Sequence, residues 1–184
     1  LVLTAGCDGN FDLKDVSIRQ ISTEKTSAPM TEDLVRHYPG DYLKLFNGKD
    51  LSGWTTTGSS VWKIENGEVL HGYSGADGGF LIHETVCKDF HLKFKFKIKK
   101  EDNSGVFIRK PAASENVSIE EAIECNIYDH DNYAHAWSTG SLATHARAWW
   151  GITDYEDWNS SEIIGYGDHV IMFVNGYKAS EAHL

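Results

Sequence analysis

The sequence predicts an all-β protein built as a β-sandwich of the jelly-roll type. Residues 91–99 alternate without a break between Leu, Phe or Ile and His or Lys, and this period of two gives a strand one buried and one solvated face. Other short apolar runs are separated by Gly and Asn, and no comparably long helical pattern occurs. The chain has 17 Gly and 3 Pro, which suits tight turns. Many short strands at this spacing are typical of sandwiches and jelly rolls.

Two Asn-Gly pairs mark hairpin turns, because both residues tolerate positive φ. Asn66-Gly67 separates two expected strands, and Asn175-Gly176 repeats the signal near the end. The chain stops inside the expected partner strand of the second hairpin, so we expect the sandwich to be truncated at the C-terminus. Besides residues 91–99, strands are expected at Leu43 to Phe46, Val61 to Glu65, Glu68 to Gly72, Phe80 to His83, Gly105 to Arg109, Glu121 to Tyr128, Glu162 to Tyr166 and His169 to Val174.

Charge and aromatic content narrow the ligand class. With 17 Lys and Arg against 27 Asp and Glu, the net charge is −10, which argues against binding nucleic acid. A neutral ligand fits better. The 6 Trp and 8 Tyr favour sugars, because a pyranose ring offers a C–H face that stacks on aromatic side chains. No run of 18 apolar residues is present to span a membrane.

The N-terminal segment has a different sequence pattern from the rest of the chain. Residues 1–7, an apolar stretch that ends in Cys7, resemble the end of a bacterial lipoprotein signal peptide, in which the Cys after the cut carries lipid. We expect residues 8–40 to be a tether with one helical turn near Thr31 to His37, and residues 41–184 to be the folded domain. A lipid anchor would hold the protein at the periplasmic or outer-membrane surface of a bacterial envelope. The alternative is an ordinary apolar N-terminus with a chance Cys.

The remaining cysteines are Cys87 and Cys125. They could pair in an oxidising compartment or remain thiols, and the sequence leaves both alternatives open.

The strand from Ile123 to Asp129 carries the strongest chemical signal. Glu124, Asn126 and Tyr128 fall on one face of an extended strand, and a β-bulge after Asn126 would add Asp129 to that face. Enzymes that cleave a glycosidic bond usually place a pair of carboxyl groups beside that bond. The alternative is a solvated outer strand face.

Arg109 ends the expected strand from Gly105 to Arg109, and Asn103 lies in the turn before that strand. We expect Arg109 to share the concave face with Phe107, where a permanently charged guanidinium suits a carbonyl oxygen that becomes an enolate. Two alternatives stay open: Arg109 paired with Glu124 as a structural contact, and Asn103 as part of a tight turn.

Residues 139–150 are expected to form a loop over the sheet. His145 is a natural proton carrier there, because its unperturbed pKa lies near neutrality. Trp149 and Trp150 are candidates for stacking against a sugar ring, and the alternative is that they pack in the core. No zinc motif occurs and no cofactor is expected, although the run 129–131 leaves a divalent cation open.

Four ordered segments resemble the 3-keto-disaccharide hydrolase domain family, also called domain of unknown function 1080. The resemblance spans residues 41–184 and implies a concanavalin A-like jelly roll. It also implies a substrate that a separate sugar 3-dehydrogenase has oxidised at C3. The segments are residues 45–54 (LFNGKDLSGW), 88–94 with 103–109 (KDFHLKF and NSGVFIR), 123–129 (IECNIYD), and 158–163 with 175–176 (WNSSEI and NG).

The implied ketone acidifies the neighbouring C2–H, so a base can remove that proton while the C1 substituent departs by β-elimination. Water then adds, which gives net hydrolysis. Glu124 or His145 would be the base, Arg109 the clamp on O3, and Asp129 the acid for the leaving oxygen. Asn103, Asn126, Tyr128, Trp149 and Trp150 would bind substrate.

Direct hydrolysis through the carboxyl pair is the mechanistic alternative. The functional alternatives are a non-catalytic carbohydrate-binding surface lipoprotein and a structural or partner-binding domain.

Overall fold

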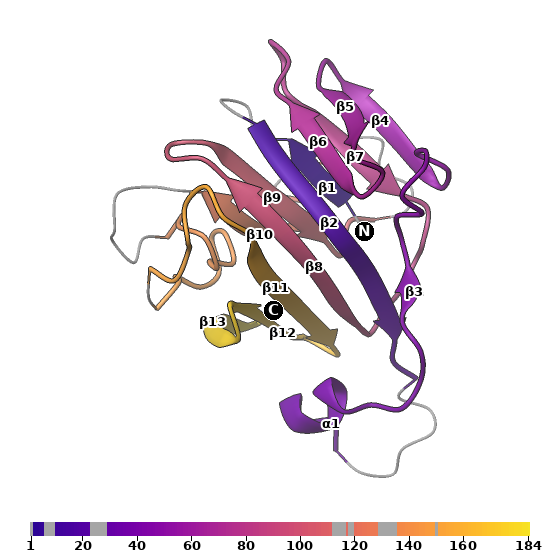
Figure 1. Cartoon of the computed structure of the whole chain (residues 1–184). Helices are drawn as coiled ribbons and strands as arrows, with labels where there is room; N and C mark the ends of the chain where they lie inside the picture. Colours follow the sequence, from indigo (N-terminus) through magenta and orange to yellow (C-terminus); the bar gives the residue numbers. More distant parts are fainter. Residues whose placement is uncertain are drawn as a thin grey trace.

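The computed structural model describes residues 2–5, 10–22, 29–111, 117, 120–128, 136–149 and 151–184, with the backbone alone for residues 2–5. Within these ranges the strands form two antiparallel sheets packed face to face (Figure 1). The smaller sheet has the order β10-β9-β1-β7-β4 and the larger sheet β13-β12-β11-β8-β2-β6-β5, with β3 also beside β2. The predicted all-β sandwich is confirmed.

The strands of the smaller sheet are β1 (Val2–Ala5), β4 (Trp54–Gly58), β7 (Gly79–His83), β9 (Asn103–Ile108) and β10 (Ile123–Tyr128). Those of the larger sheet are β2 (Asn10–Gln20), β3 (Leu43–Lys44), β5 (Val61–Glu65), β6 (Val69–Tyr73), β8 (Phe90–Ile98), β11 (Asn159–Tyr166), β12 (His169–Val174) and β13 (Tyr177–His183).

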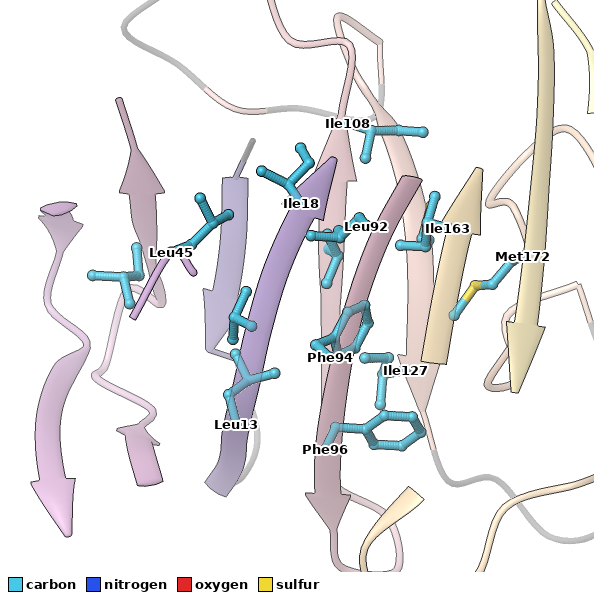
Figure 2. Close-up of a cluster of buried hydrophobic side chains, with 14 of the residues drawn as sticks. Leu13, Ile18, Leu45, Leu92, Phe94, Phe96, Ile108, Ile127, Ile163 and Met172 are labelled. Atoms are coloured by element: carbon cyan, nitrogen blue, oxygen red, sulfur yellow. The ribbon is translucent and has the colours of Figure 1, made fainter. Parts of the chain in front are cut away.

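The core lies between the sheets and follows the period-two pattern of β8. Leu92, Phe94 and Phe96 are buried, whereas Lys95 between them is exposed. Figure 2 shows these side chains beside core residues of other strands, among them Ile127 of β10. Cys125 lies in the same core as a free thiol, and Cys87 is also free.

Both predicted Asn-Gly hairpins are confirmed. Asn66 and Gly67 have φ values of 52° and 69°, and Asn175 and Gly176 have 50° and 81°, which are the left-handed pairs of a type I′ turn. The second turn joins β12 to β13, which pairs with β12 from Tyr177 to His183. The expected incompleteness at the C-terminus stays a prediction.

The expectation of a tether over residues 8–40 is wrong for β2. This strand lies between β8 and β6 in the larger sheet and buries Phe11 and Leu13 in the core. A β-bulge follows, with Asp15 at φ 54°, and it returns Val16 and Ile18 to the same core. Because the bulge shifts the apolar phase by one residue, the segment does not show the strict alternation that identifies strands.

The predicted helical turn forms helix α1 (Glu32–Arg36). Thr31 caps it by accepting a hydrogen bond from the Leu34 amide. Val35 packs with Ile164, Ile171 and Phe173, so α1 covers part of the larger sheet's outer face. In the described ranges no helix has the length and apolar character needed to cross a membrane.

Candidate functional site

The polar row on β10 is built by the register between β10 and β9. Glu124 lies opposite Phe107, Asn126 opposite Gly105, and Tyr128 opposite Asn103. Side chains alternate across a strand, so these positions share the outer face of the smaller sheet. Their neighbours Ile123, Cys125 and Ile127 lie in the core. The predicted placement of Glu124, Asn126 and Tyr128 on one face is therefore confirmed, and Asn103, opposite Tyr128, lies on the same face.

Glu124 is a partly buried carboxyl in apolar surroundings. Burial raises its pKa to about 7. Its side chain lies across Gly105 of the neighbouring strand, where an added Cβ would come 2.6 Å from Glu124 Oε1. Phe107, opposite on β9, is buried against Ala122. A carboxyl with a pKa near neutrality can both accept and donate a proton at physiological pH.

Asn126 is fully enclosed and has a structural partner. It is 2% exposed, and its side-chain amide donates to the backbone carbonyl of Trp137. This bond brings Trp137, which is partly exposed, next to the Glu124 row. Trp137 is not among the sequence-predicted site residues, because its exposure and its contact with Asn126 become visible only in the folded chain.

Residues 139–143 do not form the predicted loop over the sheet. They run beside the free edge of β10, where the amides of Asn126 and Ala143 donate to the carbonyls of Ser141 and Glu124. Leu142 is fully buried in the core. The segment therefore acts as an irregular extra strand, because the unpaired edge of β10 offers free hydrogen-bonding groups.

The structure describes two predicted site residues of the range 139–150, His145 and Trp149, and both are exposed. His145 is exposed in the turn after Leu142, and Trp149 is 61% exposed and donates its backbone N–H to Ala179 of β13. Trp149 thus lies near the edge of the larger sheet. Among the described residues, neither side chain forms a hydrogen bond or ion pair with Glu124.

Arg109 does not share a face with Glu124, contrary to the sequence-based expectation. β9 ends at Ile108, and Arg109 has φ 58°, so the strand alternation does not extend to it. Arg109 lines a small cavity with Ile18, Cys87 and Phe90, and its NH2 group lies near Gly165 of the larger sheet. Its Nε and one terminal nitrogen are buried without a hydrogen-bond partner among the described residues. The guanidinium therefore lies at one end of the sandwich interior.

Some predicted residues fall outside the described part of the chain. These are Cys7, Asp129 and Trp150, together with the possible cation ligands 129–131. The register of β10 with β9 is regular from Ile123 to Tyr128, so the expected bulge does not occur between Asn126 and Tyr128. Within the described ranges, no group of three or more His, Cys, Asp or Glu side chains is arranged to hold a metal ion.

A second polar cluster lies on the outer face of the larger sheet, beneath α1. The ring of His91 is almost fully buried; its Nδ1 accepts from the Tyr42 hydroxyl at 2.9 Å and its Nε2 donates to Glu162 Oε2 at 2.7 Å. The hydrogen bond from His91 is the largest cause that lowers the pKa of Glu162 to about 2. Arg19 donates to the carbonyls of Val35 and Arg36. This network joins α1 to the sheet.

The family assignment rests on a match over most of the chain. Residues 41–183 match the model of a family described as the 3-keto-alpha-glucoside-1,2-lyase-like domain. The chain belongs to this family. The 3-keto-alpha-glucoside-1,2-lyase-like domain therefore accounts for β3 to β13, and the match includes Glu124 and the whole polar row.

Two individual proteins resemble this domain. A 3-keto-disaccharide hydrolase from Bacteroides thetaiotaomicron is 25% identical over 170 residues, which cover 78% of this chain and 59% of the relative. The chain thus spans about three fifths of that relative. A crystal structure of a protein assigned to the glycosyl hydrolases, from Parabacteroides distasonis, has a TM-score of 0.66 and 24% identity, covering 84% of this chain and 76% of the other. That likeness concerns the fold.

Proposed function

We propose that this domain cleaves the glycosidic bond of 3-keto-glycosides, with Glu124 as the proton-transfer group. The observation that supports the proposal is the carboxyl of Glu124, which burial brings to a pKa of about 7 on an outer sheet face beside Trp137 and the polar row. The family match and the relative's description as a 3-keto-disaccharide hydrolase point to the same substrate class.

The ketone at C3 decides the chemistry. The C2–H bond is acidified by the adjacent carbonyl, so the ionised Glu124 takes that proton as the C2–H electron pair forms a C1–C2 double bond. The C1–O bond breaks, and the leaving alkoxide takes up a proton. Because the newly protonated Glu124 is an acid with a pKa near 7, it can supply this proton from the same face. The products are an unsaturated 3-keto sugar and the free alcohol.

Water then adds across the double bond to give the free 3-keto sugar, so the sum of the two steps is hydrolysis. This proposal replaces Arg109 as the oxyanion clamp, since Arg109 lies at the end of the sandwich interior. Tyr128 and Asn103, opposite each other in the same row, offer hydrogen-bond donors for sugar oxygens. Trp137 offers the stacking surface. Asp129 as the acid for the leaving oxygen and the anchor at Cys7 stay proposals.

The assay compares release of free alcohol from a 3-keto-glycoside and from its unoxidised parent. We expect cleavage of the keto substrate alone. Glu124→Gln removes the titrating proton with little change of shape, and we expect it to lower kcat by ~100-fold or more. Glu120→Gln, an exposed carboxyl four residues earlier, is the matched control and should retain activity. Equal activity of the Glu124→Gln variant and the unaltered chain would remove Glu124 from the reaction.

A non-catalytic carbohydrate-binding role is the second candidate, supported by the exposed Trp137 and Trp149. It predicts equal binding of oxidised and unoxidised sugar without turnover.

A further inference from the structure

A pocket lies on the outer face of the larger sheet, which is the side of the sandwich opposite to Glu124. Its volume is about 300 Å³, and β2, β6 and β8 contribute its walls. The polar side chains that line it are Asn10, Asp12, His71, Lys97, Lys99 and Glu156. The function proposed above uses none of them.

The centre of this pocket is a fixed pair of His71 and Asp12. These residues are opposite each other on β6 and β2, and His71 Nδ1 is hydrogen-bonded to Asp12 Oδ1. The other oxygen of Asp12 lies 3.8 Å from Lys97 Nζ. The His71 and Asp12 side chains are only 15% and 18% exposed, so water competes weakly for these contacts.

The orientation of His71 is fixed from two sides. Asp12 holds Nδ1, and the ring of Tyr73 packs against the imidazole at 4.2 Å with an interplanar angle of 62°. The remaining ring nitrogen, Nε2, has no hydrogen-bond partner among the described residues. The carboxylate fixes the orientation of the imidazole by binding one ring nitrogen. The other ring nitrogen stays available, so it presents a defined hydrogen-bonding group to a ligand.

The composition of the lining selects a neutral ligand with many hydroxyl groups. Lys97 and Lys99 balance Asp12 and Glu156, so neither an anion nor a cation meets an excess of opposite charge. The lining offers both hydrogen-bond donors, on Asn10 and the two lysines, and acceptors, on Asp12 and Glu156, and a sugar hydroxyl both donates and accepts. The volume is at the lower end of the range for small-molecule sites, which suits one ring.

We propose that this pocket binds a single neutral sugar ring, with His71 Nε2 and the carboxylate of Glu156 as the hydrogen-bonding groups for its hydroxyls. The ring would bind independently of Glu124, because the two sites occupy opposite faces of the sandwich. The proposal therefore does not depend on the cleavage reaction proposed above.

The test is an NMR titration of the ¹⁵N-labelled chain with methyl α-D-glucopyranoside and with its β anomer, which a keto-specific cleavage site does not process. We expect saturable binding in the millimolar range, with shifts concentrated at β2, β6 and β8. His71→Ala should weaken the affinity at least tenfold, and Glu156→Gln by a smaller factor. Glu124→Gln should leave the affinity of this pocket unchanged.

Several outcomes would overturn the proposal. They are the absence of saturable binding for both anomers, unchanged affinity in both pocket variants, or shifts confined to β10. Tighter binding of glucuronate than of the neutral sugars would identify an anion site instead. Glu156 is exposed, so its variant remains informative even where His71→Ala fails to fold. Failure of the cleavage assay alone leaves these measurements unaffected.

Discussion

The raised pKa of Glu124 has a consequence for stability that can be measured without any substrate. The ordinary pKa of a glutamate is 4.5, and in the folded chain it is about 7. The folded state therefore binds this proton more tightly than the unfolded state does. The resulting stabilisation is fully present below pH 4.5 and is lost as the pH rises through about 7.

The size of this effect follows from the shift. A difference of about 2.5 pKa units at 1.36 kcal/mol per unit corresponds to about 3 kcal/mol, and residual contact with water reduces this to roughly 1–3 kcal/mol. Glu124→Gln cannot ionise. We therefore expect this variant to gain roughly 1–3 kcal/mol of stability relative to the unaltered chain between pH 4.5 and pH 8.

Urea denaturation of both chains at pH 4.5, 6 and 8 measures this difference directly. Other carboxylates titrate equally in the two chains, so their contribution cancels. Glu120→Gln, at an exposed position, is the control and should show a pH-independent difference. A free-energy difference for Glu124→Gln that stays constant across this pH range would refute the shifted pKa and with it the basis for the proton-transfer role.

Three further outcomes follow from the structure. Gly140→Ala should destabilise the fold by ~1–3 kcal/mol in urea denaturation, because φ is +92° and a new Cβ would lie 2.5 Å from Ala179 Cβ. Gly151→Ala should be nearly neutral, because a new Cβ there would meet no atom of the described residues within 4 Å. Trp137→Ala should raise KM for the keto substrate roughly tenfold, whereas Trp149→Ala, which alters a side chain near β13, should change it little. Glu162→Gln should lose ~1–3 kcal/mol of stability at pH 7, and the loss should fade as the pH falls from 4.5 toward 2, because the lowered pKa of Glu162 stabilises the fold only where that carboxyl is ionised.

Strands with one buried face and a regular register were predictable from the sequence. Residues 91–99 correspond to β8 within one residue at each end, and Val61–Glu65 and His169–Val174 match β5 and β12 at both ends. In β5 and in most of β8 the more deeply buried side chains recur every second residue, whereas β12 is buried along nearly its whole length and reads as a continuous apolar run. Asn-Gly turns were equally clear, because their left-handed geometry requires particular residues.

The strands that were missed break this alternation. In β2 a bulge puts two residues instead of one between the buried Leu13 and Val16, and the charged residues between them suggested a tether. β4 contains three consecutive Thr residues after Trp54 and hence little apolar contrast between its faces. β2 forms a strand through its pairing with β8, and β4 through its pairing with β7. Both partners are distant in the sequence.

The candidate site was predictable to the extent that it follows strand alternation. The row of Glu124, Asn126 and Tyr128 is a direct consequence of period two, whereas the position of Arg109 depends on one positive φ after the strand. The pocket of Asp12 and His71 joins residues 59 positions apart, and nothing local in the sequence indicates that contact.

In the proposed reaction Glu124 transfers a proton at C2 of a 3-keto sugar. The most direct measurement is cleavage of a 3-keto-glycoside in heavy water, with the isolated sugar product analysed for deuterium at C2. We predict one deuterium at C2 with the unaltered chain, and a loss of product formation in Glu124→Gln. A product that retains only hydrogen at C2 would contradict deprotonation at C2 and favour direct hydrolysis.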